Sequence, residues 1–377
     1  MVDKNHLIKL TQSLIRIRSE NPPGDEYKIA CFVKKFFRGL GLKPKIYEFK
    51  KSRSNVIVIL EGRNNRKNLL VTPHLDTVPA GASWGISPFA GVLRDNLIYG
   101  RGASDDKGNL AVLMEAIRSI IIQKKVLGYN LIFAATADEE AGSQYGLLPL
   151  LSKGILKPQA ALILDADSFK IIVVQKGLLH IKVKIKGKSA HGAYPWEGIS
   201  AIDIALKALS SIKSEKFVYK KNPYLRPPTI NIGTISGGDK VNVVSDWCEF
   251  ELDFRFLPGM SVSGIIRQIK RIIGKYSKKF NLEIMAEQMP SEVNPCHPLV
   301  KELKRSMRKH KIRPRVSGSE GATVLTFFQE RNIPAVATGF GSSGCAHSSR
   351  EYARVDYLCR GAEILEDFFS NFKFNPL

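Results

Sequence analysis

Apolar positions in the first 170 residues alternate between helical and strand spacing. The helical spacing predicts a helix over residues 7–17, a second over 27–40 and a third beginning just after Lys107-Gly108. Short apolar runs bounded by turn residues predict buried strands over 55–60, 68–72, 129–135 and 159–164. This alternation is typical of an α/β domain.

The pattern changes after Gly177. It predicts, in order, a strand over 179–185, a helix over 199–212, strands over 229–235 and 248–256, a helix over 262–276 and a strand over 282–289. That order is the ferredoxin-like arrangement. After Pro290, helices near 298–315, 323–329 and 355–369 and a strand over 335–337 restore the α/β character. We therefore predict an α/β domain made of residues 1–177 and 293–377, interrupted by an α+β insertion over 178–292.

The composition of the 377 residues is ordinary for a globular protein, with 44% hydrophobic and 24% charged positions, and this excludes a largely disordered chain. No apolar run approaches the roughly 20 residues that span a bilayer, and the first 21 residues do not resemble a signal peptide. Five scattered cysteines form no paired framework, although Cys345 lies two residues before a candidate ligand, His347. We expect reduced thiols, no membrane contact and a cytoplasmic location.

The net charge of +22 raises the question of a nucleic-acid partner. Residues 298–315 contain eight Lys or Arg and one acidic residue, and Leu299, Leu303 and Met307 recur every four positions. This spacing predicts an amphipathic helix with a basic, solvated outer face. No aromatic residues lie between the charges and no nucleic-acid-binding module is present, so we do not expect nucleic acid to bind. An anionic substrate attracted by the overall field remains an alternative.

Candidate ligand and catalytic residues follow the predicted strands in the first half of the chain. His74 follows one strand, and Asp76, two residues on, could accept the second ring N–H and fix the tautomer. Asp105 lies in a Gly-rich turn that enters a helix, where an N-cap is the simplest interpretation. Glu139 and Glu140 follow another strand, at the sheet edge where α/β sites are built.

The combination indicates a metal site more strongly than any one of these residues. Adjacent carboxylates at a buried sheet edge are costly unless cations or a shared proton compensate them. A pair of cations resolves this, because one Glu becomes a ligand while its neighbour stays free to handle a proton. An imidazole, a carboxylate able to bridge and two adjacent carboxylates are the parts of a two-metal hydrolytic site.

These segments carry a family resemblance. The H-x-D, G-R-G-x-x-D-x-K-G and D-E-E motifs appear in this order between a segment at 18–24 and one at 346–352. In this combination the chain resembles the M20 family of zinc aminoacylases and carboxypeptidases, which includes acetylornithine deacetylase and succinyl-diaminopimelate desuccinylase. The resemblance implies a zinc-peptidase-like catalytic domain with a mixed sheet, and a lid and dimerisation role for the ferredoxin-like insertion.

The resemblance also implies the roles of individual residues. His74 and a carboxylate after the next strand would bind one metal, Asp105 would bridge, and Glu140 and His347 would complete the second. We choose Asp165 as this carboxylate because it directly follows the predicted strand. Many members have Glu-Pro-Thr there, whereas this chain has Asp165-Ala166-Asp167, so Asp167 is a competitor. Glu139 would be the general base and Asp76 the partner of His74. Two Zn²⁺ ions per chain are expected, with Co²⁺ or Mn²⁺ as substitutes.

Matching features lie in and near the insertion. His191, in a G-x-x-A-H-x-x segment, would reach the oxyanion of the partner subunit's site, which implies a homodimer through the lid domain. Arg255, in a D-x-R-x-x-P-G element, would hold the substrate carboxylate. Asn242 and Glu320, in a turn and a Gly-rich loop, are weaker substrate-binding candidates. Arg350 stands where many relatives have Asn.

The resulting expectation is an amidohydrolase that removes an acetyl or succinyl group from an N-acyl amino acid. A carboxypeptidase or dipeptidase with the same site is the main alternative, because the chemistry on a peptide bond is the same. A nucleic-acid-binding protein with a vestigial site is a more distant one, and the intact set of ligands and base argues against it.

Overall fold

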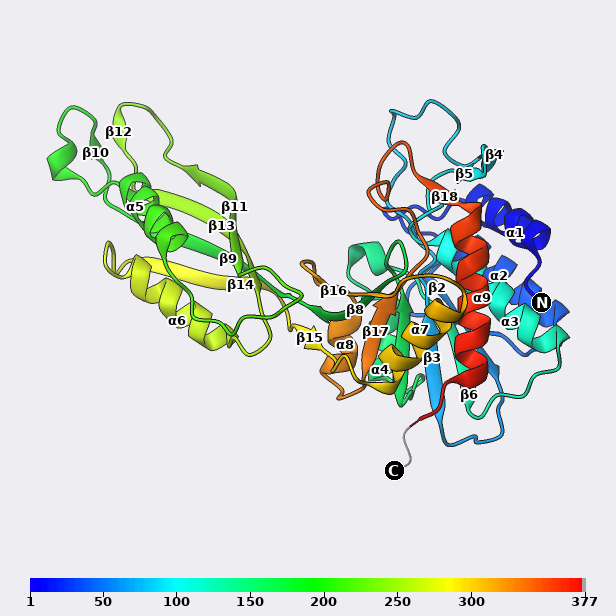
Figure 1. The fold of residues 1–377 in the computed structure, drawn as a ribbon. Coiled ribbons are helices and arrows are strands. Elements are labelled where there is room, and N and C mark those ends of the chain that lie inside the picture. The colour runs from blue at the N-terminus through cyan, green and yellow to red at the C-terminus, as the bar shows by residue number, and fades with distance from the viewer. Residues whose placement is uncertain (375–377) are drawn as a thin grey trace. The chain divides into compact units, whose positions relative to one another are not determined.

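The computed structural model describes residues 1–374 (Figure 1), and the chain divides into two compact units. Unit 1 comprises residues 1–173, 293–317 and 327–377, and unit 2 comprises residues 174–292 and 318–326. The chain is an α/β protein with a mixed sheet, as the sequence predicts.

A mixed sheet forms the centre of unit 1. Its strand order is β1-β2-β6-β3-β7-β17-β8, and β16 also pairs with β8. The last two residues of β8 belong to unit 2, where β15 pairs with them. The strands are β1 (Lys45–Glu48), β2 (Ser54–Leu60), β3 (Asn68–Thr72), β6 (Asn130–Ala135), β7 (Ala160–Leu164), β8 (Lys170–Gln175), β15 (Ser291–Glu292), β16 (Arg315–Ser319) and β17 (Ala335–Thr338). The central strand β3 runs parallel to both β6 and β7, and β17 runs parallel to β7. The carboxyl ends of these four strands therefore meet at one edge.

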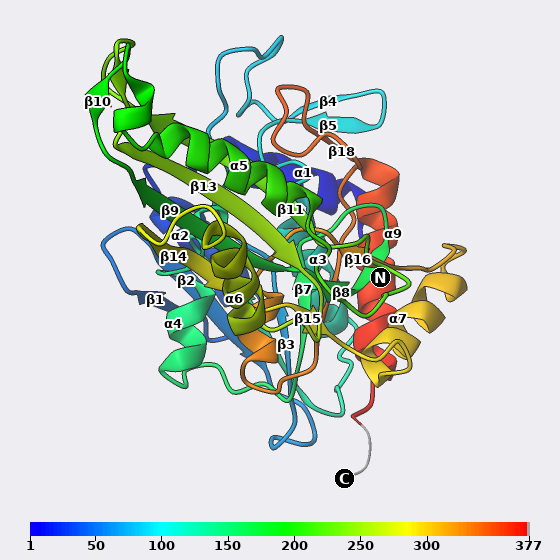
Figure 2. The ribbon, with the colours of Figure 1, turned by 90° about the vertical axis from the view of Figure 1, so that its left-hand side faces the viewer.

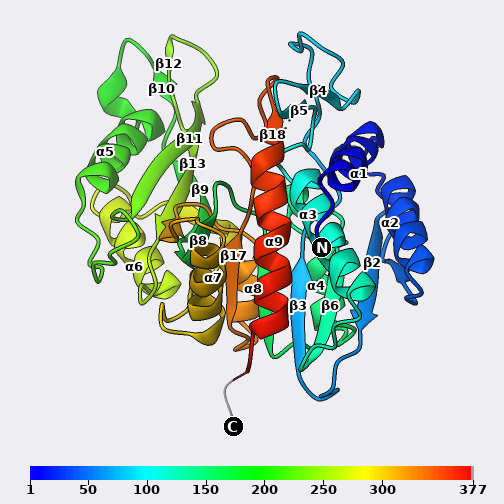
Figure 3. The same ribbon diagram turned by 45° about the vertical axis from the view of Figure 1, so that its right-hand side comes forward.

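Helices cover this sheet. They are α1 (Lys4–Arg16), α2 (Tyr27–Gly39), α3 (Lys107–Ile122), α4 (Leu147–Ser152), α7 (Pro298–Lys309), α8 (Leu325–Gln329) and α9 (Val355–Asn371). Figure 3 shows α9 along the sheet with α7 on one side and α3 on the other. Helix α3 is buried around most of its surface because it packs against both α1 and α9, which explains its nearly continuous apolar sequence.

A small antiparallel sheet of order β18-β5-β4 lies in unit 1 as well. Its strands are β4 (Val92–Arg94), β5 (Leu97–Tyr99) and β18 (Tyr352–Arg354). Tyr352 pairs with Tyr99, so the loop that ends at Glu351 is fastened beside the turn that begins at Gly100. The two loops carry His347 and Asp105.

Unit 2 has the ferredoxin-like order strand, helix, strand, strand, helix, strand. These elements are β9 (Gly177–Lys186), α5 (Ala201–Ser214), β11 (Thr229–Gly237), β13 (Trp247–Phe256), α6 (Val262–Ile273) and β14 (Phe280–Gln288). The sheet order is β11-β13-β9-β14 and all neighbours are antiparallel. Alternate side chains of β9 and β13 point into a core with α5 and α6, which lie on the same side of the sheet in Figure 2. A short ribbon of β10 (Ala190–His191) and β12 (Val243–Val244) and the 3-10 turn η2 (Pro195–Glu197) complete unit 2.

The basic stretch is not one helix. Helix α7 ends at Lys309, Lys311 has a φ of +60°, and from Arg315 the chain forms strand β16. The prediction of a helix to residue 315 was wrong. It rested on charge content, which does not mark where a helix ends, whereas Pro314 disfavours helical backbone at the residue before it. Strand β8 was missed, although its Ile-Ile-Val-Val run is apolar and buried. In residues 1–374 no helix combines the length and apolar character needed to cross a membrane.

Candidate metal centre

Three of the predicted ligand segments meet at one edge of the unit 1 sheet. His74 lies two residues after β3, Glu139 and Glu140 form the 3-10 turn η1 (Glu139–Ala141) after β6, and Asp165 directly follows β7. Because β3 is parallel to its neighbours β6 and β7, their carboxyl ends deliver these side chains to the same place. The topology of the sheet thus brings together three of the five predicted ligands and Glu139.

Asp105 and His347 come from loops. Asp105 lies in the turn that leads into α3, and His347 has a φ of +62° in the loop between β17 and β18. Asp105 is not the N-cap of α3, because Asp106 occupies that position.

The five predicted ligands form two groups that share Asp105. Ligand atoms of His74, Asp105 and Asp165 lie within 4.8 Å of one another, and so do those of Asp105, Glu140 and His347. Asp105 turns one oxygen to each group, because Oδ1 is 3.0 Å from His74 Nε2 and Oδ2 is 3.1 Å from His347 Nε2. His347 Nε2 is also 3.2 Å from Glu140 Oε1. This is the arrangement expected of a carboxylate between two cations.

The structure separates the two candidates for the last ligand. The Asp165 carboxylate belongs to the group with His74 and Asp105. Asp167 instead pairs with Lys170 at 2.7 Å. The position directly after the strand is therefore the one that faces the cluster.

Asp76 touches both His74 and the Glu139–Glu140 turn. His74 Nδ1 lies 3.0 Å from the backbone carbonyl of Asp76 and 3.5 Å from its carboxylate. The carboxylate accepts hydrogen bonds from the backbone N–H groups of Glu139 and Glu140, both at 3.1 Å, and from Asn21 Nδ2 at 2.9 Å. Asp76 therefore positions the turn that carries two site carboxylates as well as the imidazole.

The charges of the cluster fit divalent cations. Burial, and then the negative charge of Asp105, raise the pKa of Asp165 to about 6. His347 has a pKa raised to about 10 by its contacts with Asp105 and Glu140. Imidazole and carboxylate donors without thiolate suit Zn²⁺, and also Co²⁺ or Mn²⁺.

Glu139 lies next to the two groups without belonging to either. Burial, followed by the charge of Asp165, raises the pKa of Glu139 well above its usual value. A raised pKa makes a carboxylate a stronger proton acceptor, which a general base requires. The chemistry of this position is therefore consistent with the predicted base.

The four predicted residues outside this cluster lie in unit 2. His191 is exposed on β10, where its Nδ1 accepts from the N–H of Ala193 at 3.0 Å. The exposed Asn242 accepts the N–H of Gly192 on its backbone carbonyl at 2.7 Å. These two residues thus share one end of unit 2.

Arg255 and Glu320 have partners within unit 2. Arg255 donates Nε and Nη2 to Asp253 at 2.7 and 3.0 Å. Glu320 accepts the N–H of Arg226 at 2.9 Å and pairs with Lys176 Nζ at 2.6 Å. A bidentate grip of Arg255 on a substrate would therefore require it to exchange partners.

Sequence reasoning overlooked the buried residues that support the centre. Asn21 bridges Asp76 and Asp138, and the guanidinium of Arg53 pairs with both Glu26 and Asp138. Glu351 accepts hydrogen bonds from the turn that carries Asp105. Asn21 and Glu351 lie in the segments 18–24 and 346–352 that carry the family resemblance, but no local pattern shows their partners, which are distant in sequence.

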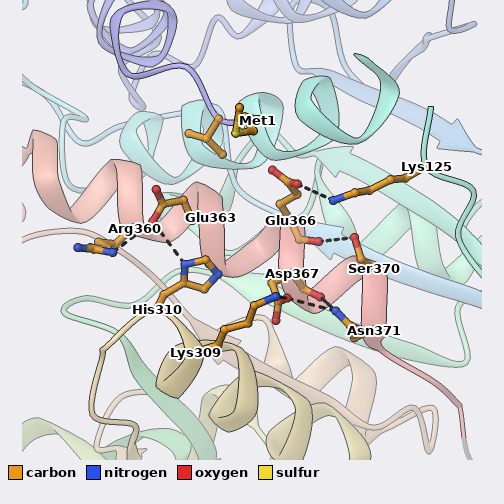
Figure 4. A pocket seen from close by; sticks show the side chains of 11 residues that line it. Met1, Lys125, Lys309, His310, Arg360, Glu363, Glu366, Asp367, Ser370 and Asn371 are labelled. Atoms are coloured by element: carbon orange, nitrogen blue, oxygen red, sulfur yellow. Dashed lines mark hydrogen bonds and ion pairs between the residues drawn. The ribbon is translucent and has the colours of Figure 1, made fainter. Parts of the chain in front are cut away.

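A second concentration of charge lies at a hollow of about 500 Å³ in unit 1 (Figure 4). Its acidic side chains have cationic partners: Glu366 pairs with Lys125, Asp367 with Lys309, and Glu363 with Arg360 and His310. These charges neutralise one another, in contrast to the excess of carboxylates at the metal centre.

Comparison with known proteins agrees with this site and fold. The sequence model of Peptidase family M20/M25/M40 matches residues 70–371. The chain belongs to this family and is a hydrolytic enzyme that acts on amide bonds.

Individual relatives extend the comparison. The chain is 29% identical to acetylornithine deacetylase from Edwardsiella ictaluri over 348 residues, which is 88% of each chain. Its fold is similar to that of aminopeptidase PepT from Bacillus cereus, with a TM-score of 0.81, 23% identity and 98% of each chain covered. It is also similar to that of the YXEP protein of Bacillus subtilis, described as a dinuclear metal-binding peptidase of the M20 family, with a TM-score of 0.77, 14% identity and 97% of each chain covered.

Proposed function

We propose that this protein is a two-metal amidohydrolase that releases an acetyl or succinyl group from an N-acyl amino acid. The observation that carries the proposal is the sharing of Asp105 between two groups of ligand atoms. His74 and Asp165 would hold one cation with Asp105, and Glu140 and His347 would hold the other. Zn²⁺ is the expected metal, with Co²⁺ or Mn²⁺ as substitutes.

Two bound cations supply Lewis acidity, which polarises the scissile carbonyl and lowers the pKa of a water molecule. The chain supplies the proton transfer. Glu139 takes a proton from the attacking water and delivers it to the leaving amine. The N–H contact of Glu139 with Asp76 fixes the turn from which its side chain extends. Asp76 also orients His74 through its carbonyl oxygen.

An N-acyl amino acid is favoured as the substrate because the acetylornithine deacetylase relative matches 88% of the chain. Arg255 is proposed to bind the free carboxylate of the substrate after releasing Asp253, with Asn242 and Glu320 as further substrate-binding residues. His191 is proposed to stabilise the oxyanion in the partner subunit of a homodimer that forms through the lid domain. A carboxypeptidase or dipeptidase is the second candidate, because the same two-metal chemistry hydrolyses a peptide bond.

The test is hydrolysis of a small panel by protein loaded with Zn²⁺ or Co²⁺. The panel contains N-acetylornithine, N-succinyl-diaminopimelate and several dipeptides. Chelated protein and Glu139→Gln are the controls, since the amide keeps the shape of Glu139 but cannot accept a proton as a carboxylate does. We expect turnover of an acyl amino acid that falls by at least about a hundredfold in Glu139→Gln and returns after the chelated protein is reloaded.

Turnover of dipeptides alone would replace the deacylase proposal by the peptidase one. Binding of fewer than two cations per chain, measured by elemental analysis, would contradict the two-metal site itself.

The dimer is tested by subunit exchange. Neither His191→Ala nor Glu139→Ala should be active alone, because each lacks one part of the composite site. An equimolar mixture should regain about a quarter of the wild-type activity if chains exchange at random, since a mixed dimer has one intact site. A mixture no more active than its components, although mixed dimers are detected by mass, would rule out the role of His191 in the partner's site.

A further inference from the structure

Glu351 is a fully buried carboxylate between the loops that carry Asp105 and His347. Its side chain is 0% exposed, and that of its ion-pair partner Arg101 is 2% exposed. Burial of this kind is costly unless every polar atom is matched, so the contacts of Glu351 show what it is fastened to. All of them lie in unit 1.

Both carboxylate oxygens of Glu351 accept two hydrogen bonds. Oε1 accepts the N–H groups of Ser104 at 2.9 Å and Asp105 at 3.0 Å. Oε2 accepts the N–H of Gly102 at 3.1 Å and Nη1 of Arg101 at 2.6 Å. Glu351 therefore holds the backbone of the turn at the residue whose side chain both cation groups share.

Arg101 continues the connection to the second loop. Its Nη2 donates to the carbonyl of His347 at 3.3 Å and to those of Pro79 and Ala80 at 3.3 and 3.4 Å. The guanidinium carbon also lies 5.3 Å from the ring centre of Trp84. The chain of contacts from Asp105 through Glu351 and Arg101 thus ends on the backbone of His347.

We propose that Glu351, acting through Arg101, is a positioning residue that sets the separation of Asp105 and His347 and thereby the affinity of the Asp105–Glu140–His347 group for its cation. This inference rests on the proposed function. It predicts an effect on both groups, because they share Asp105, and a larger effect on the Asp105–Glu140–His347 group, because Arg101 also reaches the backbone of His347.

Glu351→Gln tests the inference because the Glu351 carboxylate accepts hydrogen bonds from four donors. A glutamine amide has one oxygen and one NH₂ group, so either orientation places NH₂ against two N–H donors. Changes next to metal ligands typically cost about 10–100-fold in metal affinity. In a Co²⁺ titration followed by visible absorption and calorimetry, we expect one of the two binding steps to lose at least about tenfold in affinity. The other step should lose clearly less, and the absorption spectrum of the more weakened site should change shape.

Glu115→Gln is the matched control. Glu115 is also 0% exposed and accepts four contacts, from the N–H of Asp3, from His6 and from Nε and Nη2 of Arg118. It should lower the melting temperature and leave both Co²⁺ steps as in the wild type. Arg101→Lys is the second variant, because it keeps a cation for Glu351 but lacks the fork that reaches His347, and it should weaken the same step to a smaller extent.

The outcomes separate the inference from the proposed function. Two unchanged binding steps in Glu351→Gln would overturn the inference, and so would an equal weakening in Glu115→Gln, since that effect would be general loosening. If Glu351→Gln does not fold, Arg101→Lys decides, and two unchanged binding steps there overturn the inference. Wild-type protein that binds fewer than two Co²⁺ ions would overturn the proposed function and the inference together.

Discussion

Arg53 tests how buried charges support the candidate metal centre. Its guanidinium is 6% exposed and donates to Glu26 through Nε at 2.9 Å and through Nη2 at 2.8 Å. The same Nη2 donates to Asp138 at 2.8 Å, one residue before Glu139. Glu26 and Asp138 are themselves almost completely buried. One cation therefore compensates two buried carboxylates.

Arg53→Met removes that cation and keeps most of the apolar stem. Breaking a buried ion pair by removing one partner typically costs about 3–5 kcal/mol, because the remaining charge is left without compensation. In a domain of this size each kcal/mol lowers the melting temperature by roughly 2–4 °C, so we expect a decrease of about 10 °C. Arg66→Met, at an exposed arginine, is the control and should stay within about 0.5 kcal/mol of the wild type.

The loss should depend on pH in a defined direction. Burial, and then the charge of Asp76, raise the pKa of Glu26 from 4.5 to about 7, even with Arg53 beside it. Between these values the folded chain holds a proton that the unfolded chain has released. The stability that Glu26 contributes is thus fully present below about pH 4.5 and is lost as the pH rises through 7. Removing Arg53 raises the folded pKa further, so the deficit of Arg53→Met should grow with pH.

The assay is urea unfolding of chelated protein at about pH 5.5 and about pH 8.5. Chelation matters because bound cations add stability to the folded state alone. A deficit that is larger at the higher pH supports the reasoning. A deficit below about 1 kcal/mol, or one that shrinks as the pH rises, would show that the pair does not compensate buried charge as described.

Two further changes test other parts of the fold. Gly339→Ala would place a Cβ 1.8 Å from the carbonyl oxygen of Ala166, next to Asp165. We expect weaker Co²⁺ binding by roughly tenfold at the His74 group, measured by titration, and an unchanged isotherm would contradict the close approach. Asp367→Asn should cost about 1 kcal/mol at pH 7, discounted for the exposure of its partner Lys309 (Figure 4). Burial, the largest single influence, would raise the pKa of Asp367, but the contacts with Lys309, Ser306 and Arg305 together lower it. The deficit seen in thermal melts should therefore vanish as the pH falls below about 4 and persist above it.

Much of the fold was accessible from the sequence because its long elements have strong periodicity. The predicted strand over 68–72 coincides with β3, and the alternation over 179–185 lies within β9. Short strands such as β18 were not predicted, since three residues carry no period and form only when a partner is present. The end of α7 was misjudged, although Pro314 carried a usable signal.

Only part of the candidate site could be predicted from the sequence. Residues that follow predicted parallel strands, such as His74 and Asp165, could be brought together by topology alone. His347 could be added only through the family resemblance, because nothing local places its loop beside Asp105. Glu351 and Arg101 are 250 positions apart, so their pairing could not be inferred from either segment. The supporting network is thus the part of the site that needs coordinates.

The supporting charges allow their contributions to stability and to activity to be tested separately. A buried ion pair is often no more stabilising than well-packed apolar residues of similar volume, whereas losing one partner is strongly destabilising. Replacing Arg53 and Glu26 together by Met and Leu should therefore recover part of the stability lost in Arg53→Met, with Asp138 still unpaired. The double variant would still lack the guanidinium that donates to Asp138, the residue directly before the Glu139 turn. A double variant more stable than Arg53→Met but equally low in kcat would show that the charges are kept for the geometry of the site, and equal recovery of both would show that they only support the fold.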